Sequence, residues 1–135
     1  NIKSDGLQNK VRELLEKYQI QNYFVFDMSV PDTINYIKQG IVVFSRVSEL
    51  EGNNVLNSMA NGIWLDQFYS DWFSADLIKD LIDSYGRVCI VSPELHNRRR
   101  GMCWEMLLQL PINIRSKIML CTDFPNEAKE FFNEV

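Results

Sequence analysis

The chain has 135 residues, of which 46% are hydrophobic and 24% charged, and its formal net charge is −4. This size and composition are those of one globular domain, and they exclude a collagen, a coiled coil and a disordered chain. The net negative charge gives no overall positive field that would attract nucleic acid, so nucleic-acid binding is not expected. No apolar run is long enough to span a bilayer, so no membrane span is expected either.

Six short apolar runs recur along the chain, and each is followed by polar or charged residues. They predict strands near residues 1–3, 23–27, 41–45, 62–66, 88–92 and 118–122. The runs are too short for helices, and their β-branched and aromatic residues are typical of strands that are buried on both faces of a sheet.

Amphipathic segments between the runs predict helices over residues 7–20, 31–39, 55–60, 75–85, 102–110 and 125–132. Ser74 is a favourable N-cap for the fourth helix, and Gly86 follows its end. Each strand and helix together take about 25 residues, as in a (β/α)₈ barrel. Such alternation requires right-handed crossovers and a parallel sheet. The chain is therefore either an open doubly wound sheet or most of a barrel that lacks its first strands.

Charged and polar residues gather where the predicted strands end. They are Lys3, Asp5, Asp27, Ser29, Arg46, Glu49, Asp66, Glu94, His96, Arg98 and Asp123. Ligands bind at the carboxyl ends of strands in both architectures, so we expect one functional rim. Asp27 is either a nucleophile or metal ligand, or a cap for the following helix. His96 is the only histidine, so this chain alone does not provide a two-histidine acid–base mechanism.

Five strings carry a resemblance to a known family. They are 1–7 (NIKSDGL), 26–31 (FDMSVP), 62–66 (GIWLD), 91–96 (VSPELH) and 121–125 (CTDFP). Together they resemble the carboxyl-terminal part of the phospholipase C-like phosphodiesterase barrels, close to glycerophosphodiester phosphodiesterases. The resemblance implies an α/β fold made of the later strands of a parallel (β/α) barrel, a partial TIM barrel. Residues 1–135 would be one domain, the C-terminal portion of a larger (β/α)₈ barrel, and we expect the sequence to begin inside a longer protein.

The resemblance also implies a function, the hydrolysis of a small phosphodiester in lipid metabolism. In that family a strand ends in Glu-x-Lys, whose glutamate binds the metal and whose lysine helps to bind phosphate. Here Lys3 keeps the lysine and Asn1 stands at the glutamate position. We expect catalytic roles for Lys3, Asp27 and Glu94. We expect substrate-binding roles for Arg46, Asp66, His96 and Asp123.

Several family groups on the early strands are absent from this chain: the His-Arg pair, the Glu-x-Asp metal ligands and a second histidine. Cleavage of a phosphodiester needs proton transfer at the attacking and the leaving oxygen, so we expect the chain alone to be inactive. A divalent metal, Mg or Ca, is expected only in the complete barrel, and no metal ligand is expected here. Cys89, Cys103 and Cys121 form no CxxC pair, which argues against a disulfide framework or zinc site and favours a reducing cytoplasm.

Two alternatives remain open. The sequence loosely resembles the haloacid-dehalogenase-like phosphohydrolases, with Asp27 as nucleophile and Ser92, Lys117 and Asp123 in the later motifs. Those enzymes need a second aspartate two positions after the nucleophile, where this chain has Ser29. The other alternative is a binding module that keeps the barrel rim without catalysis.

Overall fold

A parallel sheet of four strands organises the chain, which the computed structural model describes over residues 1–133. The strands are β1 (Phe44–Val47), β2 (Gly62–Leu65), β3 (Val88–Val91) and β4 (Ile118–Cys121). They lie side by side in chain order, and every neighbouring pair is parallel. The predicted α/β fold with a parallel sheet is confirmed.

The two N-terminal segments that were predicted as strands do not form regular strands. Val25 makes one isolated parallel bridge with Val43, and the Ile2 amide donates to the Phe26 carbonyl at 3.0 Å. Both segments therefore continue the sheet in chain order but pair at single points, so the prediction of six strands is wrong. Asp27 has a φ of 73°, in the left-handed region, and this turn takes the chain out of the extended conformation that pairing needs.

The helices follow the predicted segments with shifts of a few residues at their ends. They are α1 (Gln8–Lys17), α2 (Val30–Lys38), α3 (Val55–Met59), α4 (Ala75–Tyr85), α5 (Gly101–Leu108), α6 (Ile112–Arg115) and α7 (Pro125–Asn133), with a short 3₁₀ helix, η1 (Pro93–His96). For α4 the predicted caps are confirmed: Ser74 Oγ accepts from the Leu77 amide at 3.2 Å, and Gly86 has a φ of 83°. The pattern missed η1 and α6, because four residues are too few to show a helical period.

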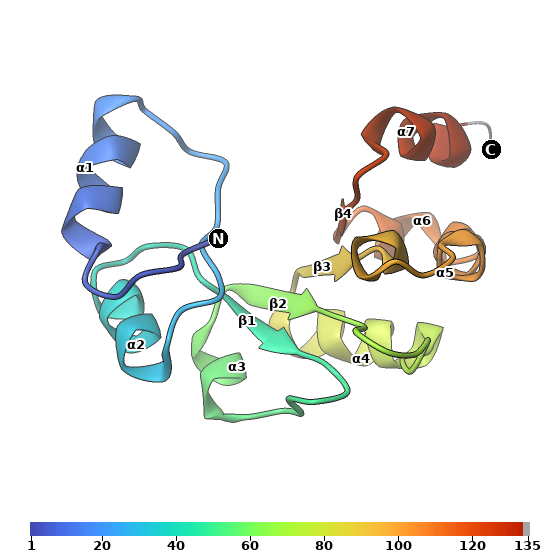
Figure 1. Cartoon of the computed structure of the whole chain (residues 1–135), viewed down its shortest axis with the longest axis horizontal. Helices are drawn as coiled ribbons and strands as arrows, with labels where there is room; N and C mark the ends of the chain where they lie inside the picture. Colours follow the sequence, from blue (N-terminus) through green and yellow to red (C-terminus); the bar gives the residue numbers. More distant parts are fainter. Residues whose placement is uncertain (134–135) are drawn as a thin grey trace.

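One face of the sheet is covered by helices. Alternate strand residues such as Ile63 and Ile90 pack in one cluster with Ile78 of α4 and Trp104 of α5. At the N-terminal side a second cluster joins Val25 and Val43 to α1 and α2. Figure 1 shows α1 and α2 at one end of the sheet and α5, α6 and α7 at the other. This burial of alternate side chains under helices is what holds the crossovers to the sheet.

The opposite face of the sheet is lined mainly by the side chains of the strands themselves. Its buried residues are Phe44, Trp64, Cys89 and Val91. Aromatic rings pack across it: Phe24 stacks on Phe44 with ring centroids 4.1 Å apart, and Phe26 stacks on Trp64 at 3.9 Å. Within residues 1–133 no α-helix contributes to this cluster, which we call the inner face.

No helix within residues 1–133 has the length and apolar character needed to cross a membrane. The three cysteines carry free thiols. Burial raises the pKa of the Cys89 thiol to about 12 and that of Cys103 to about 11, so both thiols are protonated at neutral pH.

Gly62 provides a test of the packing between β1 and β2. A Cβ atom at this position would lie 2.6 Å from Phe44 Cζ and 2.8 Å from the Arg87 carbonyl oxygen. Gly62→Ala should therefore lower the free energy of unfolding by about 1–3 kcal/mol, measured by urea denaturation.

The matched control is Gly101→Ala, where a Cβ meets open space. It should leave stability unchanged or raise it by about 0.4–1 kcal/mol. Equal stability of the two variants would contradict the packing described.

Candidate functional site

Asp27 is the centre of a charged cluster at the carboxyl end of the sheet. Its carboxylate forms ion pairs with Lys3 and, at 3.0 Å, with Arg46 Nη2, and the Asn1 amide donates to it at 3.3 Å. Burial by itself raises the pKa of Asp27, but the hydrogen bond from Lys3 and the charge of Arg46 outweigh it and hold this pKa below its usual range. Asp27 is therefore ionised at neutral pH, and it joins the N-terminal segment to the end of β1.

Arg46 extends this cluster toward the centre of the sheet. Its Nε donates to Glu51 at 2.5 Å, and its guanidinium lies over the Phe68 ring, 5.7 Å from the centroid. A cavity of about 140 Å³ opens beside the Asp27–Arg46 pair. The Lys3 side chain is 72% exposed and that of Arg46 is 32% exposed, so both cations are accessible to a ligand.

Asp66 and His96 form a second pair at the same end of the sheet. Asp66 follows β2 and is buried, and its Oδ1 lies 2.7 Å from His96 Nε2. The Gln67 amide donates to the same oxygen at 2.9 Å, and Trp64 Nε1 donates to Oδ2 at 3.2 Å. The Phe68 ring packs against His96, with centroids 4.8 Å apart. Phe68 thus contacts both the Arg46 guanidinium and the His96 imidazole.

Glu94 ties β3 to β4 through its carboxylate. One oxygen accepts from Ser92, and the other accepts from Thr122 and, at 3.3 Å, from the Asp123 amide. Burial alone raises the pKa of Glu94, but these donors outweigh it and lower the pKa below the usual range. Ser92 in turn accepts from Trp104 Nε1 at 2.8 Å. The network anchors the loop that carries His96.

Glu49 holds the loop after β2 in a similar way. Its carboxylate accepts from the amides of Phe68 at 3.1 Å, Tyr69 at 2.6 Å and Ser70 at 3.3 Å. Burial on its own raises the pKa of Glu49, but these backbone donors outweigh it, so the pKa lies below its usual range. The contact holds the loop that places Phe68 against Arg46 and His96.

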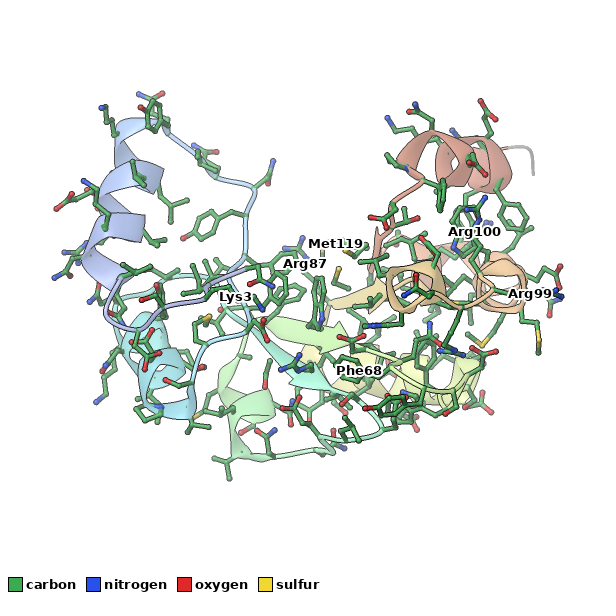
Figure 2. All side chains as sticks on the ribbon, in the orientation of Figure 1. Lys3, Phe68, Arg87, Arg99, Arg100 and Met119 are labelled. Atoms are coloured by element: carbon green, nitrogen blue, oxygen red, sulfur yellow. The ribbon has the colours of Figure 1, made fainter. Side chains whose placement is uncertain are left out.

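The structure therefore brings the predicted site residues into three groups along one edge. Lys3, Asp27 and Arg46 are in contact, Asp66 holds His96, and Glu94 is bonded to the loop of Asp123. Within residues 1–133 no hydrogen bond or ion pair involves the exposed Asp123 side chain. Figure 2 shows Lys3 and Phe68 near the middle of the molecule and Arg99 at its far edge.

Sequence reasoning did not single out Glu51 or Phe68, and it treated Ser92 and Thr122 only as parts of motifs. A signal was present for Glu51, because it lies two residues after Glu49 in the same loop. For Phe68 no local signal exists, since an aromatic residue after a strand more often packs in the core.

The residues present at this edge do not fit a divalent metal. Both carboxylate oxygens of Asp27 are already bonded to cationic or amide donors, and the Asn1 side chain that contacts Asp27 is a neutral amide. In the described part of the chain no group of three or more His, Cys, Asp or Glu side chains has the arrangement of a metal site.

Comparison of the chain with family models, with curated proteins and with solved structures returned no match.

Glu49→Gln tests the carboxylate that fixes the Phe68 loop. Hydrogen bonds to a charged acceptor contribute more than neutral ones, so the variant should lose about 1–3 kcal/mol of unfolding free energy at pH 7. The folded pKa of Glu49 is lowered, so this stabilisation is complete above the unfolded value of about 4.3 and is lost as pH falls through the folded pKa. Urea denaturation from neutral to acidic pH measures the difference.

The matched control is Glu105→Gln on the exposed side of α5, which should change stability by less than about 0.5 kcal/mol. A difference between wild type and Glu49→Gln that stays constant down to acidic pH would contradict the role of the Glu49 charge.

Proposed function

We propose that this chain is the phosphate-binding part of a phosphoric diester hydrolase of the barrel type, similar to glycerophosphodiester phosphodiesterases. The observation that carries the proposal is the pair of accessible cations, Lys3 and Arg46, held on Asp27 at the carboxyl end of a parallel sheet. Ligands of parallel α/β proteins bind at this end.

The strand order supports a barrel over a doubly wound sheet. A doubly wound sheet has a point at which the strand order reverses and carries helices on both faces. Here β1 to β4 follow one another without a reversal, and the residues 1–3 and 23–27 continue that order. The α-helices of the described residues cover one face, as they do outside a barrel. This arrangement gives less support to the haloacid-dehalogenase-like alternative, in which Asp27 would be the nucleophile.

Arg46 and Lys3 keep donors for an anion despite their ion pairs. A guanidinium has five N–H donors, and Arg46 uses Nε for Glu51 and Nη2 for Asp27. Lys3 has three donors and binds Asp27. The remaining donors can bind the non-bridging oxygens of a phosphate, and an arginine matches the geometry of such oxygens well. We assign Lys3 and Arg46 to phosphate binding and Asp27 to orienting them.

The exposure of β4 supports the proposal that further strands complete the barrel. β4 is half-exposed along its whole length, whereas every residue of β2 and β3 is buried. Its free edge offers backbone donors and acceptors to another parallel strand. We propose that the completing strands supply the second proton-transfer group and any metal ligands, and that the substrate is a small phosphodiester.

Calorimetric titration of the 135-residue chain with inorganic phosphate tests the binding site. Arg46→Ala should weaken binding by roughly 10- to 100-fold, since a hydrogen bond to a charged group contributes about 1.5–3 kcal/mol. Asp27→Asn removes the charge that orients both cations, so it should weaken binding by roughly two- to fivefold, since partly exposed ion pairs contribute about 0.2–1 kcal/mol. Asparagine tolerates the left-handed backbone of this position, so the turn is kept.

The matched control is Arg99→Ala, which removes an exposed arginine far from Lys3 and should leave binding unchanged (Figure 2). Failure of phosphate to bind, or equal effects of Arg46→Ala and Arg99→Ala, would overturn the proposal.

Turnover is expected to require the completing strands. The chain alone should not hydrolyse a phosphodiester, because it has one histidine and lacks the second proton-transfer group. In a protein with the completing strands, Lys3→Ala should lower turnover by roughly 10²–10³ through loss of a charged phosphate ligand. Stability should change little, since the Lys3 side chain is exposed. Hydrolysis is followed with a chromogenic phosphodiester. Measurable hydrolysis by the 135 residues would contradict the proposal that the completing strands supply a required proton-transfer group.

A further inference from the structure

The Asp66 carboxylate determines which nitrogen of His96 carries the proton. An indole N–H and a backbone N–H are donors only, so Trp64 and Gln67 require acceptor oxygens on Asp66. Each carboxylate oxygen receives one of these donors, which is the pattern of the ionised form. The short contact of 2.7 Å between Asp66 Oδ1 and His96 Nε2 then requires that Nε2 donates.

His96 Nδ1 is consequently the nitrogen with a free lone pair in the neutral imidazole. Among the described residues no hydrogen-bond partner of Nδ1 is found, and the His96 side chain is 22% exposed. Phe68 packs against the ring at an interplanar angle of 55°. A buried carboxylate that holds one imidazole nitrogen while the other faces outward is the arrangement of a general base with its orienting group.

We infer that His96 Nδ1 is a proton-transfer group of the phosphate site, with Asp66 as its positioning residue. This inference rests on the proposed function and deepens it. The Arg46 guanidinium lies 5.7 Å from the Phe68 ring centroid, and the imidazole centroid lies 4.8 Å from the same ring. The guanidinium and the imidazole thus contact the same aromatic ring, so a phosphate on Arg46 and a water molecule on Nδ1 lie close together along the same edge of the sheet.

The step is a hydrolysis, in which the oxygen of water forms a bond to phosphorus. One proton of that water moves to His96 Nδ1, and Nε2–H stays on Asp66, which stabilises the imidazolium. The bond from phosphorus to the leaving alkoxide breaks, and the alkoxide takes the electron pair and then a proton from solvent or from a donor on the completing strands. The imidazolium returns its proton to solvent, which leaves a phosphomonoester and an alcohol.

The single histidine makes the test direct, because ¹⁵N-labelled histidine gives one imidazole in the spectrum of the full chain. Long-range ¹H–¹⁵N correlation well above the ordinary imidazole pKa of about 6.5 should show the proton on Nε2 and a bare Nδ1. Asp66→Asn replaces one acceptor oxygen with an NH2 donor and removes the negative charge, so it should give a mixture of both tautomers. Titration with inorganic phosphate should then shift the Nδ1 resonance of the wild type with the dissociation constant found by calorimetry. Arg46→Ala should abolish that shift, and Arg99→Ala should keep it.

A proton on Nδ1 in the wild type would overturn the inference. Calorimetric binding of phosphate without a shift of the Nδ1 resonance would overturn it as well, and would leave the proposed function standing. Absence of phosphate binding would overturn the proposed function and the role of His96 with it. A purely structural His96 would fix the tautomer without responding to phosphate, so the titration separates the two roles.

Discussion

The charged edge of the sheet depends on Asp27 in its left-handed turn. The turn ends the pairing of the segment before it and directs the carboxylate back toward Lys3 and Arg46. An aspartate accepts such a backbone at a lower cost than most residues, because its short side chain can bond locally. One residue therefore both ends the pairing of the 23–27 segment with the sheet and assembles the cations that we assign to phosphate.

Carboxylates give the rest of this edge its rigidity. Glu49 binds three consecutive amides after β2, and Glu94 joins the ends of β3 and β4. Each is held ionised by donors from a loop far away in the sequence, and a lost partner would leave the other group unsatisfied. The loops that carry Phe68 and His96 are thus fixed before any ligand arrives. A site that is organised in advance spends less free energy on reorganisation when charge develops.

The two faces of the sheet have different partners, and this difference connects the fold to the proposed function. Isoleucines and valines on one face are buried under helices, whereas Phe44 and Trp64 on the other stack with aromatic rings of the neighbouring segment. In a barrel the second face becomes the interior, which is filled by side chains and opens at the carboxyl end. Trp64 illustrates the link, since its ring belongs to the inner face and its N–H donates to Asp66.

The sequence alone determined the parallel α/β class, the positions of β2, β3 and β4, the caps Ser74 and Gly86, and the edge on which Asp27, Arg46, Asp66 and Glu94 lie. These features follow from hydrophobic period, strand length and capping, which act between residues close in the chain. Only the tertiary structure decided that residues 1–3 and 23–27 pair at single points, that Glu49 binds the loop of Phe68, and that His96 Nε2 contacts Asp66. Those outcomes depend on which loops the crossovers bring together, 20 to 30 residues apart in sequence, and on a backbone turn at Asp27 that an aspartate permits but does not require.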